Sequence, residues 1–210
     1  MKQLVLELAP QPQPTLDNFV VGRNGTVLAA LRSLVYAPEA GAVVYLYGEP
    51  GAGKSHLLRA VAEVWRRQGR SLARFLVADD VHRLDDNAQG ALFDAFNEAR
   101  AAGGAIIAAG DITPHQLVVR EDLRTRLASG LSFHLQALSD SEKAAALAQR
   151  AGELGMRLND DAIGYLLTHV RRDMPTLMTV LSTIDDYSLA NKRLVTLPLI
   201  REALQTLEAN

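Results

Sequence analysis

The chain has 210 residues, 48% of them hydrophobic, which is enough for one domain or for a core with a small lid. Its net charge of −2 lacks the basic excess of a general nucleic-acid-binding surface, and the absence of cysteine excludes disulfides and thiolate metal sites. Because we find no signal peptide and no apolar run of about 18 residues, we expect a cytoplasmic protein without a membrane partner.

The chain opens on a segment with alternating apolar residues. Leu4, Leu6 and Leu8 alternate behind Gln3, and a Pro/Gln-rich tether follows as far as residue 14. This alternation fits a short edge strand on the chain's own core. It fits equally an extended peptide whose apolar side chains fill a pocket on another protein. These residues alone leave both interpretations open.

An apolar segment, residues 15–24, precedes a helical pattern that extends to about Tyr36. It reaches Gly22 shortly before a predicted buried strand, residues 42–47. That position favours a role in covering an adenine ring, with Val21 and Gly22 as the expected contacts. A plain core segment is the alternative interpretation for each of these residues.

A glycine-rich loop dominates the sequence. Residues 48–55, GEPGAGKS, fit the pattern G-x-x-x-x-G-K-[ST] and lie between the predicted strand and a helical pattern that runs to Gln68. Backbone N–H groups of such a loop bind phosphates, with Lys54 on the β- and γ-phosphates and Ser55 on Mg²⁺. The expected nucleotide-binding residues here are Gly48, Pro50, Gly51, Ala52, Gly53, Lys54, Ser55 and His56.

Two further strands are predicted to end in acidic residues. Residues 73–80 form an apolar run ending in Asp79 and Asp80. We expect Asp79 to hold Mg²⁺, mostly through water, and Asp80 to orient or deprotonate an attacking water. After a predicted helix at 87–102, the run 105–109 leads to Asp111, which would lie beside the γ-phosphate. A plain turn is the alternative for Asp111.

The rest of the core is predicted as a helix over 117–127 and a strand over 131–135. The helix carries Arg120, Arg124 and Arg126, and its periodicity does not single out any of the three. Four helices follow, opening at the capping box of Ser139 and Glu142, at Asn159, at Pro175 and at Pro198. The expected architecture is therefore an α/β core with a mostly parallel sheet (15–136) and an all-helical lid (137–210), after a peptide and tether (1–14).

Together these motifs resemble the AAA+ ATPases, and specifically the DnaA-type branch of replication initiators. Residues 15–24 are similar to the adenine-side segment of that branch, 48–55 to Walker A and 79–80 to Walker B. Residues 110–114 resemble the end of the sensor 1 strand. Residues 122–130 resemble the segment that carries the arginine finger, and Arg126 falls on the position of the finger.

The resemblance also covers the ends of the chain. Initiators of this branch continue into a helix-turn-helix domain, whereas this sequence stops at Asn210, so we expect no sequence-specific DNA binding. Regulatory inactivators within the branch lack that domain and begin with a clamp-binding peptide, Q-L-x-L-x-L. Residues 3–8 match this peptide at Gln3, Leu4, Leu6 and Leu8, which favours the partner-binding interpretation.

The resemblance implies a mechanism in trans. Residues 3–8 would bind the polymerase sliding clamp, and Arg126 would stimulate hydrolysis of the ATP bound by the initiator DnaA, which suppresses re-initiation of replication. The chain's own nucleotide, ADP or ATP with Mg²⁺, would act mainly as a conformational ligand. A self-assembling ATPase such as a helicase loader, using Asp80 as its base, is the alternative, and a nucleotide-binding scaffold without activity is a third.

The sequence departs from the family pattern at three points. Asp79 follows Ser55 by only 24 positions, so either one edge strand and helix are missing or residues 73–80 merge two strands. Pro175 occupies the place of the lid's sensor 2 arginine, and Arg172 is the better of two nearby substitutes. The pair Asp79-Asp80 leaves slow hydrolysis by the chain itself open.

Overall fold

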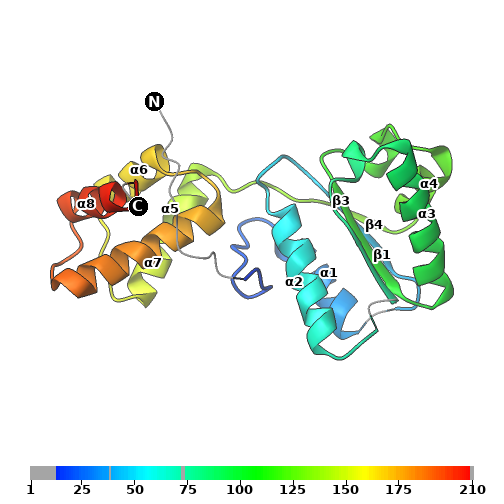
Figure 1. Cartoon of the computed structure of the whole chain (residues 1–210), viewed down its shortest axis with the longest axis horizontal. Helices are drawn as coiled ribbons and strands as arrows, with labels where there is room; N and C mark the ends of the chain where they lie inside the picture. The colour runs from blue at the N-terminus through cyan, green and yellow to red at the C-terminus, as the bar shows by residue number, and fades with distance from the viewer. Residues whose placement is uncertain (1–12, 38, 72–73, 209–210) are drawn as a thin grey trace. The chain divides into compact units, whose positions relative to one another are not determined.

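The computed structural model describes residues 13–37, 39–71 and 74–208. These residues divide into two compact units, one spanning 14–137 and the other containing 138–208 (Figure 1). The clamp-binding peptide predicted at residues 3–8 lies outside the described residues. Within the described ranges no helix is long and apolar enough to cross a membrane.

In its described residues, the first unit is built on a parallel sheet of four strands. Strand β1 (Val43–Tyr47) lies between β3 (Ala105–Gly110) and β4 (Leu131–His134), and β2 (Phe75–Ala78) pairs with the far side of β3. The order is therefore β2-β3-β1-β4, with the glycine-rich loop following one of the two inner strands. Parallel neighbours end at the same edge, so residues that follow β1, β2 and β3 are brought together there.

Helices cover both faces of this sheet. Helices α1 (Gly25–Tyr36) and α2 (Lys54–Arg67) lie on one face, and α3 (Asp86–Ala101) and α4 (Glu121–Leu127) on the other (Figure 1). Within β1, Val44 and Leu46 pack into the cluster of α1 and α2, whereas Val43 and Tyr45 pack toward the opposite face. This burial on both sides explains why the inner strands are continuous apolar runs.

The short spacing between the glycine-rich loop and Asp79 reflects a missing strand and helix. Among the described residues, β2 is the only strand between α2 and α3. It has four residues, so the described residues 74–80 contain one strand rather than two. The predicted α/β architecture with one edge unit missing is confirmed.

The helix predicted over residues 117–127 is wrong in its first turn. The structure has a 3₁₀ turn, η3 (Pro114–Gln116), followed by non-helical residues, and α4 begins only at Glu121. Leu117 is fully buried outside any helix, and the backbone N–H of Arg120 donates to the Gln89 side chain at 2.8 Å. A contact with another helix therefore overrides the local periodicity.

The second unit is a bundle of four helices: α5 (Asp140–Glu153), α6 (Asp160–His169), α7 (Met174–Asn191) and α8 (Leu197–Glu208). Ser139 and Glu142 form the predicted reciprocal capping box. Asn159 caps α6, and Pro175 lies in the first turn of α7, as the sequence indicated. The helices share an apolar core of their own, with Leu147, Leu166, Leu177 and Leu199 all fully buried.

Replacement of Leu166 by alanine will destabilise the helical unit. The side chain is fully buried in that unit's core, and a cavity of this kind costs about 2–5 kcal/mol. Hydrogen exchange will show reduced protection of amides in α5–α8. Leu189→Ala is the matched control, because Leu189 is 69% exposed and its loss should cost less than about 0.5 kcal/mol. Equal effects of the two variants would contradict this account of the core.

Candidate nucleotide-binding site

The glycine-rich loop connects β1 to α2 and needs glycine at specific points. A Cβ at Gly48 would collide with the backbone oxygen of Leu135, and the residue has a φ of +154°. Gly53 has a φ of +102°, and a Cβ there would lie 2.8 Å from the Phe19 ring. These two glycines therefore let the loop pass close to its neighbours in conformations that favour glycine.

Lys54, the first residue of α2, has all of its donors engaged within the protein. Its Nζ donates to the backbone oxygens of Gly48 at 2.6 Å and Glu49 at 3.1 Å. It also lies 3.0 Å from Oδ1 of Asp111, at the end of β3. A lysine ammonium has three donors, so these three acceptors satisfy a side chain that is only 6% exposed. A phosphate that binds Lys54 must replace at least one of them.

Asp111 thus lies beside Lys54, and its place beside the γ-phosphate stays a prediction. The hydrogen bond from Lys54 holds the pKa of the Asp111 carboxyl below its usual range, and the positive charge of Lys54 adds to this effect. The second carboxylate oxygen, Oδ2, lies 3.1 Å from Nε2 of His82. Asp111 is therefore held from both sides by Lys54 and His82.

Tyr45, on β1, stabilises the turn that contains Asp111. Its hydroxyl donates to the backbone oxygen of Ile112 at 3.1 Å, and the residue is fully buried in β1. A Cβ at Gly110 would collide with this hydroxyl. Burial and the nearby Asp111 charge raise the pKa of Tyr45 above its usual value, so the hydroxyl remains a donor at neutral pH.

The end of β2 brings Asp80 rather than Asp79 toward Asp111. Ligand atoms of Asp80, His82 and Asp111 all lie within 4.8 Å of one another. Asp79 instead accepts the backbone N–H of Asp80 at 2.9 Å. Asp80 adopts a left-handed backbone, with a φ of 48°, and precedes the 3₁₀ turn η2 (Val81–Arg83). The assignment of Asp79 to a metal ion stays a prediction.

Sequence reasoning missed His82. Its imidazole lies close to Asp111, and its buried Nδ1 has no hydrogen-bond partner among the described residues. The only signal in the sequence is its position two residues after a strand-end acidic pair. The 3₁₀ turn η2 begins directly after Asp80. His82 therefore stays at the edge of the sheet where Asp111 and the phosphate loop lie.

The segment before α1 packs against the start of α2. Phe19 lies beside Gly53, and its ring centroid is 5.6 Å from that of His56. His56 Nε2 donates to the backbone oxygen of Thr15 at 2.9 Å, and burial lowers the pKa of His56. The segment therefore lies next to the phosphate loop. Its predicted role in covering the adenine ring requires this position.

Asn24 fixes the other end of this segment. Its side-chain amide donates to the backbone oxygen of Gln136 at 2.9 Å and accepts the backbone N–H of the same residue at 2.8 Å. Between these anchors, Val21 is half-buried against the core, and Gly22 is exposed with a φ of 49°. The backbone at Val21 and Gly22 is therefore held in place from both sides.

Arg126 lies on α4, packed against α3. Its guanidinium carbon is 5.2 Å from the ring centroid of Phe93 and 5.8 Å from that of Phe96. The side chain is half-buried. This arrangement leaves the predicted finger ordered at the surface of the core.

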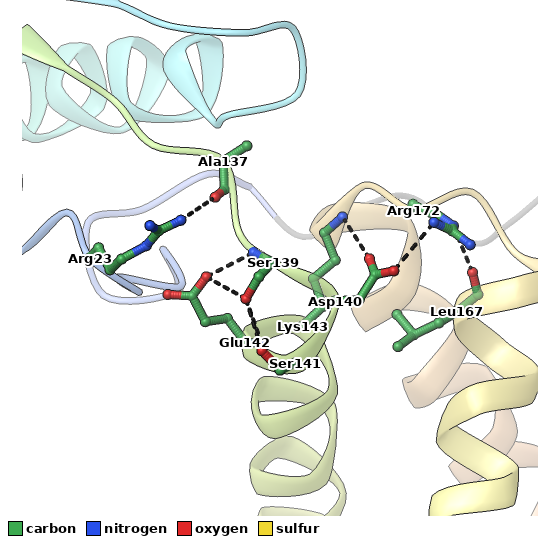
Figure 2. Close-up of polar contacts among 9 residues, drawn as sticks. All are labelled: Arg23, Ala137, Ser139, Asp140, Ser141, Glu142, Lys143, Leu167 and Arg172. Carbon is green, nitrogen blue, oxygen red and sulfur yellow. Dashed lines mark hydrogen bonds and ion pairs between the residues drawn. The ribbon is translucent and has the colours of Figure 1, made fainter.

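Arg172 lies in the second unit, at the end of α6. Its Nε donates to the backbone oxygen of Leu167 at 3.0 Å, and its Nη1 lies 3.4 Å from Oδ2 of Asp140. Figure 2 shows both contacts, with Lys143 on the other oxygen of Asp140 at 3.8 Å. Arg171 pairs instead with Asp173 at 3.1 Å. The proposed nucleotide contact of Arg172 stays a prediction.

Solved structures share this fold. Domain III of the Thermotoga maritima initiation protein DnaA has a TM-score of 0.68 at 20% identity, covering 96% of this chain and all of that one. AMPPCP-bound DnaA from Aquifex aeolicus has a TM-score of 0.67 at 22% identity, covering 85% of this chain and 66% of that one. The Thermotoga maritima RuvB Holliday junction branch migration motor has a TM-score of 0.61 at 17% identity, covering 95% and 74%. The phosphate loop, parallel sheet and helical lid therefore define an AAA+ fold.

Two family models refine this class. The model of the bacterial DnaA ATPase domain matches residues 11–75, which include the glycine-rich loop. The model of the Hda lid domain matches residues 140–204, which is nearly the whole helical unit. Together with the shared fold, these two matches support a Hda/DnaA-type AAA+ protein.

Removal of the Asp111 charge will destabilise the protein in a pH-dependent way. Because the folded-state pKa of Asp111 lies below its unfolded value, its contribution is complete above the unfolded pKa of about 4 and is lost as the pH falls through the folded pKa. We expect Asp111→Asn to lower the free energy of unfolding by about 1 kcal/mol at pH 7, since the pair is partly exposed. Urea titrations at pH 7, 5 and 3 will measure this.

The control is Asp17→Asn. Asp17 pairs with Arg32 at 3.2 Å, but its side chain is 92% exposed, so its loss should change stability by less than about 0.5 kcal/mol. A deficit in Asp111→Asn that persisted unchanged at pH 3 would show that the charge is not its cause.

Proposed function

We propose that this chain is a regulator of the replication initiator DnaA. It binds ADP or ATP with Mg²⁺, attaches to the polymerase sliding clamp through residues 3–8, and presents Arg126 to ATP bound by the initiator. Hydrolysis of that ATP leaves the initiator in its ADP form, and re-initiation is suppressed.

The observation that carries this proposal is the lid. Residues 140–204 match the Hda lid model, and they directly follow a core of the DnaA type. A nucleotide-binding core by itself supports many functions. The combination of this lid with the peptide Gln3-Leu4-x-Leu6-x-Leu8 supports a regulator that acts at the clamp.

The chemistry asked of Arg126 is stabilisation of charge on a transferring phosphoryl group. A guanidinium supplied in trans is worth about 10³–10⁵ in rate. Arg126 makes no ion pair among the residues that the structure describes, so its charge is not compensated by a carboxylate. This supports its assignment as the finger.

The chain's own loop fits a Mg²⁺-nucleotide. Lys54 would bind the β- and γ-phosphates in place of its present acceptors, and Ser55 would offer its hydroxyl to the metal. Carboxylates at the ends of β2 and β3 supply the oxygen donors that Mg²⁺ prefers. DnaA structures that share the fold contain AMPPCP. In this proposal Arg172 supplies the cation of the lid in place of the arginine that Pro175 replaces.

One observation favours a second candidate function, an autonomous AAA+ ATPase such as a helicase loader. A carboxylate oxygen of Asp80 lies within 4.8 Å of a carboxylate oxygen of Asp111. A carboxylate at this position can orient an attacking water. In that case the purified chain turns over ATP as a homo-oligomer without the initiator, and Asp80→Asn abolishes the turnover. Copurified ADP without turnover would oppose it.

Replacement of Arg126 by alanine will abolish stimulation of the initiator's ATPase. We expect the rate on clamp-loaded DNA to fall by about 10³-fold or to the unstimulated level, because the phosphoryl charge loses its guanidinium. Hydrolysis of labelled ATP bound to the initiator measures this. Arg124→Ala is the control on the same helix, because Arg124 is paired with Glu121. Full stimulation by Arg126→Ala would remove the finger assignment.

Replacement of Gln3 and Leu4 by alanine will abolish stimulation of the initiator's ATPase only in assays that depend on the clamp. We expect this double variant to lose binding to the clamp in surface plasmon resonance while keeping nucleotide binding, because the core is unchanged. Glu7→Ala is the matched control, since position 7 is a variable position of Q-L-x-L-x-L. If the double variant binds the clamp normally, residues 3–8 are not the clamp-binding peptide.

A further inference from the structure

The three arginines around α4 differ in how their charges are compensated. Arg120 lies 2.7 Å from Asp122, and Arg124 pairs with Glu121. Arg126 makes no ion pair within residues 13–37, 39–71 and 74–208, and its guanidinium lies over two aromatic rings. The local surroundings of Arg126 are therefore unlike those of its neighbours, although all three share one short segment.

An aromatic face holds a guanidinium without neutralising it. The ring attracts the cation through its quadrupole, whereas a carboxylate would cancel the charge and occupy the N–H donors. In a face-on contact the N–H groups at the edge of the guanidinium remain available to phosphate oxygens. The rings at 5.2 and 5.8 Å thus restrict the side chain and keep its charge.

One face of α3 supplies these contacts. Gln89, Phe93 and Phe96 follow one another at a spacing of four and three residues, which places them on the same side of the helix. The Gln89 side chain is 6% exposed; it donates to the backbone oxygen of Leu84 at 2.9 Å and accepts the N–H of Arg120 at 2.8 Å. Gln89 therefore fixes the start of α4, and the rings lie where the side chain of Arg126 emerges at its end.

We infer that Phe93 is a positioning residue for Arg126, holding the guanidinium in a charged, phosphate-accessible orientation before the partner arrives. Phe96 is fully buried in the core, so its ring is constrained by packing. Phe93 is half-buried, which leaves its ring available for this role. The inference rests on the proposed function, since it concerns the residue that acts on the initiator.

The first test needs no partner. The arginine Nε–Hε resonance of Arg126, assigned by its loss in Arg126→Lys, will carry a ring-current shift in the full-length protein. Phe93→Leu should move this resonance toward its value in an unstructured peptide, and Phe93→Tyr should leave it in place, because tyrosine keeps the ring. Circular dichroism and thermal melting verify that each variant is folded.

The second test measures stimulation of the initiator's ATPase on clamp-loaded DNA. We expect Phe93→Leu to lower the maximal stimulated rate about 3- to 10-fold, with an unchanged concentration for half-maximal stimulation. Phe93→Tyr should restore the rate. In the Arg126→Ala background, Phe93→Leu should have no further effect, because the two residues act as a unit.

Arg120→Ala is the matched control, since its guanidinium carbon also lies over Phe93, at 5.7 Å. If Arg120→Ala reproduces the Phe93→Leu defect, the ring acts through Arg120 rather than Arg126, and the inference is overturned. It is also overturned if Phe93→Tyr fails like Phe93→Leu, or if only the half-maximal concentration rises, which would indicate a direct contact with the initiator. Full stimulation by Arg126→Ala would instead overturn the proposed function, whatever the Phe93 variants do.

Discussion

The contact between Lys54 and Asp111 is the constraint on which the site depends. It joins the first turn of α2 to the end of β3, two elements that meet only because β1 and β3 are parallel neighbours. A buried ammonium requires full hydrogen bonding, and Asp111 supplies the acceptor that the two loop carbonyls cannot. Tyr45 and His82 then hold Asp111 itself. These contacts tie the phosphate loop to the end of β3.

The two faces of the sheet serve different purposes. On the side of α1 and α2, the segment with Phe19 and Asn24 is tied to the start of the phosphate helix and to the strand end near Gln136. On the side of α3 and α4, Gln89 and Phe93 order the arginine-bearing helix. Val44 and Leu46 pack into the core on the side of α1 and α2, and Val43 and Tyr45 pack on the side of α3 and α4. Strand β1 therefore contributes side chains to both sides of the sheet.

Local chemistry made much of this fold predictable. The glycine-rich loop, the apolar strands and the caps at Ser139 and Asn159 depend on residues that are close in sequence, so pattern and propensity suffice. The start of α4 was not predictable, because it is set by a hydrogen bond to Gln89, 31 positions away. His82 and Phe93 were missed for the same reason. Their partners lie on other elements, and no local pattern marks a histidine or phenylalanine that contacts them.

Lys54 and Arg126 differ in how their charges are compensated among the described residues. Lys54 is buried, and its charge is compensated by Asp111 at 3.0 Å. Arg126 carries a full charge that aromatic rings orient but do not cancel. A low-dielectric protein–protein contact strengthens such a charge when phosphate approaches. In the function proposed above, Arg126 acts on the nucleotide of another protein, and no carboxylate among the described residues pairs with it.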